Sequence, residues 1–156
     1  MIQNTFYLVY SGHWDRDKGQ DYGRLSLNCT EQGNLAIWIA TTSTAIRQQY
    51  DNQFKLYGCI PANNCTKDRK YHILTKPEDS SRVKGVEGNF YRIYPYTVNT
   101  TKGTKRTALG IHKDAGVTGS LGCIVLSPGR FFSFEYNMEV LRKQGITQIP
   151  LQVQYS

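Results

Sequence analysis

The sequence predicts a mainly β domain with one late helix, and three observations carry this prediction. Short stretches with alternating apolar residues recur along the first two thirds of the chain, separated by Gly, Asn, Ser and Pro. Aromatic residues make up 12% of the sequence, and the 11 tyrosines among them favour strands. The apolar spacing becomes helical only after residue 127.

The predicted strands alternate with turns and two long loops. A Gly-Asn pair lies between 24–28 and 35–42, so we expect these two segments to form a hairpin. Pro95 places the end of 89–98 at a sheet edge or a bulge, because proline cannot donate to a strand ladder. The remaining strands are predicted at 6–10, at 71–75 and through Leu151, Val153 and Tyr155, and the loops at 43–70 and 76–88.

The helix has recognisable start and stop signals. Ser127 is a favourable N-cap residue and Pro128 follows at the first helical position. Gly145 ends the pattern. Four apolar residues at helical spacing predict the face that packs against the sheet: Phe131, Phe134, Met138 and Leu141.

Composition sets bounds on organisation and partners. A chain of 156 residues with 39% hydrophobic and 20% charged residues predicts one globular domain over 1–156, and we expect a monomer. The net charge of +7 favours an anionic partner such as nucleic acid, a membrane surface or an acidic wall polymer. The basic residues are dispersed, which favours a solvated surface over nucleic-acid binding. We expect no membrane span and recognise no signal peptide.

The 4 cysteines show no metal-binding spacing, so neither a metal nor another cofactor is predicted. Cys59 and Cys65 lie close enough in sequence to form a disulfide-closed loop, and their oxidised and free states both stay open. Cys29 is interpreted as a plain buried or edge thiol.

The most informative stretch is 109–126, in which a histidine, a glycine-rich loop and a cysteine lie between two apolar segments. A thiol becomes an effective nucleophile as thiolate, so it needs a base nearby and N–H groups that hold the oxyanion. His112 offers the base and Cys123 the nucleophile. Ser120 and Gly122 are small enough to let the backbone approach a substrate carbonyl. A lone His and Cys are more often structural, but this local pattern favours a nucleophilic site.

The order of strand, Ile-His, glycine-rich loop, Ser-x-Gly-Cys-Ile, helix and terminal strand resembles the L,D-transpeptidase catalytic domain. The specific match covers 96–126, and the order of elements agrees more loosely over most of the chain. The short His-to-Cys gap is similar to a compact branch of that superfamily, which includes type VI secretion effectors. The resemblance implies an L,D-transpeptidase-like β sandwich with one helix after the catalytic cysteine.

The resemblance also implies a reaction. Cys123 would be the nucleophile and His112 its base, oriented by a backbone carbonyl near Lys113. The substrate would be the tetrapeptide stem of peptidoglycan, and a thioester would form as D-alanine leaves. Transfer to an amine gives a cross-link or an exchanged D-amino acid, whereas transfer to water makes the enzyme an L,D-carboxypeptidase. Such a protein would act in the periplasm or cell wall, and as an antibacterial effector it would have an immunity or secretion partner.

Supporting roles follow from the same resemblance. The N–H groups of Gly122 and Cys123 would form the oxyanion hole, and Ser120 would shape the loop. Arg106 and Asp114 are candidate substrate-binding or supporting groups.

Some positions depart from the family pattern, and two classes of function stay open. Lys113 replaces a common Gly, and Leu121, Val125 and Leu126 stand where polar residues are common, which alters the substrate contacts. The first class is an L,D-transpeptidase or carboxypeptidase. The second is a non-catalytic wall-binding module on the same fold, in which Cys123 is inert. A cysteine peptidase or amidase of another fold is disfavoured because no His follows Cys123.

Overall fold

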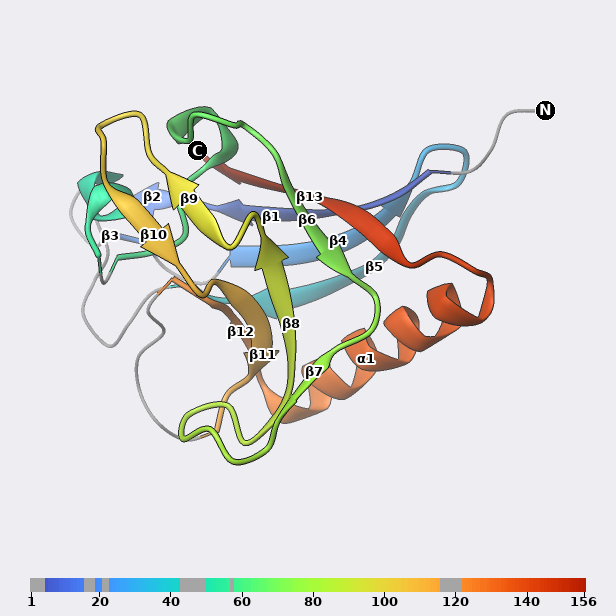
Figure 1. The fold of residues 1–156 in the computed structure, drawn as a ribbon. Coiled ribbons are helices and arrows are strands. Elements are labelled where there is room, and N and C mark those ends of the chain that lie inside the picture. Colours follow the sequence, from blue (N-terminus) through green and yellow to red (C-terminus); the bar gives the residue numbers. More distant parts are fainter. Residues whose placement is uncertain (1–4, 16–18, 21–22, 43–49, 57, 116–121) are drawn as a thin grey trace.

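The computed structural model describes residues 5–15, 19–20, 23–42, 50–56, 58–115 and 122–156. Figure 1 shows a curled β-sheet with one α-helix, α1 (Pro128–Lys143), packed along its side. The prediction of a mainly β fold with a helix after Cys123 is confirmed. In the described part of the chain, no helix has the length and apolar character that crossing a membrane requires.

The main sheet is mixed and contains nine strands. In chain order these are β1 (Phe6–Gly12), β4 (Gly23–Cys29), β5 (Gly33–Ala40), β6 (Tyr71–Leu74), β7 (Glu78–Ser80), β8 (Gly88–Tyr94), β11 (Gly110–Lys113), β12 (Ile124–Leu126) and β13 (Gln148–Tyr155). Their spatial order is β12-β11-β8-β6-β13-β1-β4-β5, with β7 beside β8. The last strand of the chain therefore lies in the middle of the sheet, parallel to β1 and antiparallel to β6.

Smaller elements flank this sheet. One two-stranded sheet pairs β9 (Thr97–Asn99) with β10 (Lys105–Thr107), and another pairs β2 (Trp14–Asp15) with β3 (Gly19–Gln20). Two short 3-10 helices, η1 (Tyr50–Phe54) and η2 (Asn63–Cys65), lie in the segment predicted as a long loop.

The two end strands of the main sheet meet. Thr41 follows β5, and its N–H donates to the Val125 carbonyl of β12 at 3.1 Å. In return the Val125 N–H donates to the Thr41 carbonyl at 2.8 Å. The strands of the predicted sandwich are thus parts of one curled sheet, and α1 packs where its ends join, against β5, β11 and β12.

The core fills the inside of this curl. Alternate residues of the long strands face inward, as the period of two requires, and Leu8, Leu27 and Leu151 are at most 2% exposed. Phe134 of α1 packs edge-on against Trp38, with ring centroids 5.5 Å apart. The four helix residues predicted to pack against the sheet are all buried: Phe131, Phe134, Met138 and Leu141.

The structure also corrects several sequence-based boundaries. The predicted hairpin is present as β4 and β5. The prediction of one strand over 89–98 is wrong, because β8 ends at Tyr94 and the chain turns at Pro95 before β9 joins a separate sheet. The loop predicted at 76–88 contains β7, whose charged sequence carries no apolar alternation. Ser127 does precede the helix, but its side chain makes no cap hydrogen bond.

Candidate active site

His112 lies in β11, and Cys123 immediately precedes β12, the neighbouring parallel strand. The register pairs Ile111 with Ile124 and His112 with Val125. Both isoleucines are fully buried in the core, so His112 and Val125 face the opposite side. Cys123 belongs to the small apolar cluster against which Val125 packs, so its side chain lies on that side too. The sheet register therefore brings the predicted base and nucleophile to one face.

Phe90 of β8 links the two residues. Its ring stacks on the His112 imidazole, with centroids 5.9 Å apart and planes 27° apart. Phe90 also belongs, with Val86, to the small apolar cluster that contains Cys123. The sequence showed alternation at Phe90 but gave no sign that this ring would pack against the site.

The His112 ring is oriented by the backbone. Nδ1 lies 2.8 Å from the Lys113 carbonyl oxygen. Because a carbonyl can only accept, Nδ1 carries the proton and Nε2 is the nitrogen that can accept one. Burial lowers the pKa of His112, and the Lys113 carbonyl and the Asp114 carboxylate partly oppose that shift. The imidazole is therefore neutral at neutral pH, as a general base must be.

The Cys123 thiol is held by a carbonyl in its resting state. Its side chain is buried at 9% exposure, and Sγ donates a weak hydrogen bond to the Ala108 carbonyl at 3.8 Å. Ala108 has a φ of 59°, in the left-handed region that few non-glycine residues adopt. The thiolate is the nucleophilic form of cysteine, so this thiol needs a base that removes its proton.

Gly122 is required by the local geometry. Its φ of 93° lies in the left-handed region. A Cβ at this position would come within 2.4 Å of Arg106 Nη2 and 2.9 Å of Leu109 Cδ2. Only glycine fits this turn next to Cys123. Ser120, the other small residue predicted to shape the loop, lies outside the described residues, as does Leu121.

Arg106 lies beneath this turn. The residue belongs to β10 and is only 1% exposed. Nη1 donates to the carbonyls of Gln53 and Cys59 at 2.9 and 3.0 Å, and Nη2 donates to the Gly58 carbonyl at 2.6 Å. Burial lowers the pKa of Arg106, but a guanidinium stays protonated at neutral pH. The structure thus places this candidate substrate-binding residue under the Cys123 backbone, with its guanidinium on buried backbone carbonyls.

Gln53 extends this network. No sequence signal marks Gln53, because it lies in a polar segment without periodicity, yet it is fully buried. Its Oε1 accepts from the Ala62 N–H at 2.8 Å, and its Nε2 donates to the Tyr50 carbonyl at 3.0 Å. The backbone that receives Arg106 is therefore itself fixed by a buried side chain.

The four cysteines are free thiols in the structure, so no disulfide joins Cys59 to Cys65. Within the described residues, no three His, Cys, Asp or Glu side chains gather closely enough to hold a metal ion.

A base and a thiol on one face, beside the Gly122 turn, are the groups that nucleophilic cysteine chemistry needs. The chain matches no protein-family model, no curated protein and no solved structure.

Proposed function

We propose that the protein is a cysteine-dependent acyl-transfer enzyme that acts on peptidoglycan tetrapeptide stems, as an L,D-transpeptidase or L,D-carboxypeptidase. The observation that supports it best is the common face of His112 and Cys123, with Nδ1 held by the Lys113 carbonyl. The substrate class rests on the resemblance of 96–126 to that family. The enzyme would meet its substrate in the periplasm or cell wall.

In the first half-reaction, His112 Nε2 takes the Sγ proton and the thiolate attacks the carbonyl carbon of the bond to the terminal D-alanine. The oxyanion is held by the N–H groups of Gly122 and Cys123. When the tetrahedral intermediate collapses, the imidazolium gives its proton to the D-alanine nitrogen, and the carbon–nitrogen bond breaks. A thioester remains on Cys123.

In the second half-reaction, an amine or water gives a proton to His112 and attacks the thioester carbon. The carbon–sulfur bond breaks, and Cys123 leaves as thiolate and recovers the proton from His112. Asp114 supports both halves, because its carboxylate favours the imidazolium over the neutral ring.

We assign Arg106 as a positioning residue. At 1% exposure it does not reach substrate, but its guanidinium holds the carbonyls of Gly58 and Cys59 against the Gly122 turn. Its positive charge also lies close enough to Cys123 to interact with a negative sulfur.

A non-catalytic wall-binding module is the second candidate. The observation that favours it is the resting thiol, which is buried at 9% exposure and donates to the Ala108 carbonyl. A buried, protonated thiol of this kind is inert unless His112 removes its proton.

One experiment separates the two candidates. Tetrapeptide muropeptides are incubated with wild type, Cys123→Ala, His112→Ala and the matched control Cys29→Ala, a buried thiol in β4. Mass spectrometry then follows D-alanine release, dimers and a thioester adduct. We expect Cys123→Ala and His112→Ala to lower turnover at least about 1,000-fold, as loss of a nucleophile or base does, while Cys29→Ala stays active. Identical product profiles for wild type and Cys123→Ala would remove the enzyme proposal.

A further inference from the structure

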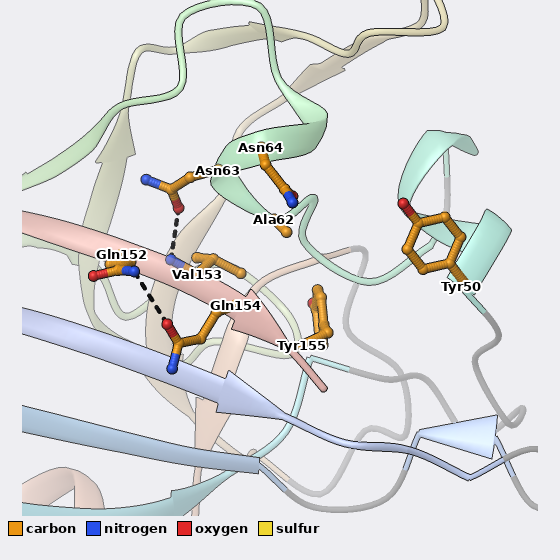
Figure 2. Close-up of a pocket in the computed structure, with 8 residues that line it drawn as sticks. All are labelled: Tyr50, Ala62, Asn63, Asn64, Gln152, Val153, Gln154 and Tyr155. Atoms are coloured by element: carbon orange, nitrogen blue, oxygen red, sulfur yellow. Dashed lines mark hydrogen bonds between the residues drawn. The ribbon is translucent and has the colours of Figure 1, made fainter.

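A cavity of about 230 Å³ lies at the end of β13. Figure 2 shows that the last residues of β13 form one side, η2 forms a second and Tyr50 of η1 a third. Nothing in the reaction proposed for Cys123 uses this cavity. Its polar and aromatic lining consists of Tyr50, Asn63, Asn64, Gln152, Gln154 and Tyr155.

The walls of the cavity are tied together by hydrogen bonds. Asn63 Oδ1 accepts from the Val153 N–H at 2.6 Å, and its Nδ2 donates to the Arg69 carbonyl at 3.1 Å. The Tyr155 hydroxyl donates to the Ile60 carbonyl at 2.6 Å. Because these bonds fix η2 and β13 relative to each other, the cavity exists before any ligand arrives. A preformed site avoids the free-energy cost of ordering its walls on binding.

The position of the cavity limits what can bind. β13 pairs with β1 as far as Tyr155, but with β6 only over Gln148–Leu151. The rest of β13 therefore has an edge that could accept an added strand from a peptide. Asn63 already occupies that edge through the Val153 N–H. A compact ligand fits this arrangement better than an extended peptide.

The chemistry of the lining indicates a neutral ligand. Although the chain carries a net charge of +7, none of the residues that line the cavity is charged. Four of them are carboxamides, which donate and accept at once and so match hydroxyl groups, which do the same. Tyr50 is half exposed and adds an aromatic face for an apolar ring face.

Two of these carboxamides keep hydrogen-bonding capacity. Gln152 Nε2 donates to Gln154 Oε1 at 3.0 Å, and Gln154 Nε2 donates to Ser11 Oγ at 3.0 Å. Asn64 Oδ1 accepts from Cys65 Sγ at 3.5 Å. Within the described part of the chain, these bonds leave Gln152 Oε1 to accept and Asn64 Nδ2 to donate. The cavity volume of about 230 Å³ is smaller than the roughly 300–1,000 Å³ of sites for drug-sized molecules. This size suits a ligand with a single ring.

We propose that this cavity binds one ring of a neutral glycan, through the carboxamides of Asn64 and Gln152 and the aromatic face of Tyr50. The site is separate from the Cys123 chemistry, and glycan binding here does not depend on the proposed enzyme activity.

The test uses the full chain carrying Cys123→Ala, so that no reaction accompanies binding. Chitotriose and cellotriose are titrated to about 10 mM, where a ligand with a Kd of about 1 mM is mostly bound, and amide chemical shifts are followed by NMR. We expect shifts at the amides of Asn64, Val153 and Gln154. Binding of both sugars supports a site for neutral sugars in general, and binding of chitotriose alone supports one that reads the acetamido group.

Variants localise the effect. Gln152→Ala and Asn64→Ala should each weaken binding about fivefold, as expected for one lost hydrogen bond. Gln148→Ala is the matched control, because it is exposed on the same strand and face but does not line the cavity, and its affinity should be unchanged. The proposal is overturned if neither sugar shifts the cavity amides, or if Gln148→Ala weakens binding as much as Gln152→Ala. Since Cys123 is absent, the enzyme proposal can fail while this one stands.

Discussion

Two regions of the molecule are built on different principles. The packed region consists of β1, β4, β5, β13 and α1, with strands of 7 or 8 residues around an apolar interior. The site region consists of β11, β12, η1, η2 and the Arg106 side chain, and its two strands have only 4 and 3 residues. The packed region is held mainly by burial of apolar surface. The site region depends on buried polar groups bonded to irregular backbone.

The buried polar residues show this division. Of the seven buried polar residues in the described part of the chain, Thr42, Gln53, Arg106 and His112 belong to the site region or its border, whereas Thr75 bonds to the Ile146 carbonyl beside the packed region. Three of those four bond to backbone groups that have no strand partner. Thr42 accepts from the Ile60 N–H at 3.1 Å, Gln53 accepts from the Ala62 N–H, and Arg106 donates to the Gly58 carbonyl. Such bonds allow a chain to follow a path that places a thiol and an imidazole together, since each buried backbone group still finds a partner.

Truncation in the packed region should have the largest effect. Phe134→Ala removes a fully buried ring that packs on Trp38, and we expect the free energy of unfolding to fall by about 3–5 kcal/mol in urea titrations. Phe132→Ala on the same helix is the matched control, because Phe132 is 77% exposed and should change stability by less than about 0.5 kcal/mol. Equal losses for the two variants would contradict the packing described for α1.

Removal of the Arg106 guanidinium tests the site region. Arg106→Met leaves the carbonyls of Gln53, Gly58 and Cys59 without this donor, and we expect about 3 kcal/mol of destabilisation at about 1 kcal/mol per carbonyl. Urea unfolding measures the loss, and Arg82→Met, at an exposed position, serves as the control. If Arg106→Met were as stable as Arg82→Met, the site region would not depend on this side chain.

Two glycines that both have a positive φ allow a sharper comparison. Gly122 and Gly33 have φ values of 93° and 76°, but an added Cβ meets Arg106 and Leu109 only at Gly122, and nothing within 4 Å at Gly33. We expect Gly122→Ala to cost about 2 kcal/mol more than Gly33→Ala, because only the first adds overpacking to backbone strain. Thermal or urea unfolding of both variants gives the difference, and its absence would show that the Arg106 side chain moves aside freely.

The smallest effect should be a pH dependence that arises in the site region. Burial lowers the pKa of His112 in the folded state, so the unfolded chain binds more protons between that lowered pKa and the usual value of 6.5. The stability that comes from neutral His112 should therefore be fully present above pH 6.5, and it should be lost as the pH falls through this window. Urea titrations between about pH 7.5 and pH 5 should show a steeper loss for wild type than for His112→Gln. Parallel curves would mean that His112 is not desolvated.

The same division decides what the sequence could predict. The hairpin of β4 and β5 and the buried face of α1 followed from periodicity and turn residues, because burial on one face imposes that period. The positions of His112 and Cys123 were visible as a local pattern. Their common face was not, because it depends on the parallel register of β11 and β12.

Long-range polar contacts were beyond a reading of the sequence. Arg106 binds backbone carbonyls about fifty positions earlier in the chain. Every residue has such a carbonyl, so the sequence does not indicate which ones will accept this bond. Gln53 lies in a polar segment and looked like part of a surface loop, yet it is fully buried. The amide is needed there because the folded chain buries backbone groups that require a hydrogen-bond partner.

The central place of β13 has a consequence for how the protein is made. A nascent chain that has emerged through Cys123 already carries both His112 and the thiol, but the strand between β1 and β6 is still missing. Until residues 148–155 are added, only the Thr41–Val125 bridge among the described strand pairings joins the half with β6, β8, β11 and β12 to the half with β1, β4 and β5. The candidate site therefore gains its full sheet support only after β13 has been added, which couples its formation to a strand that follows it in the chain.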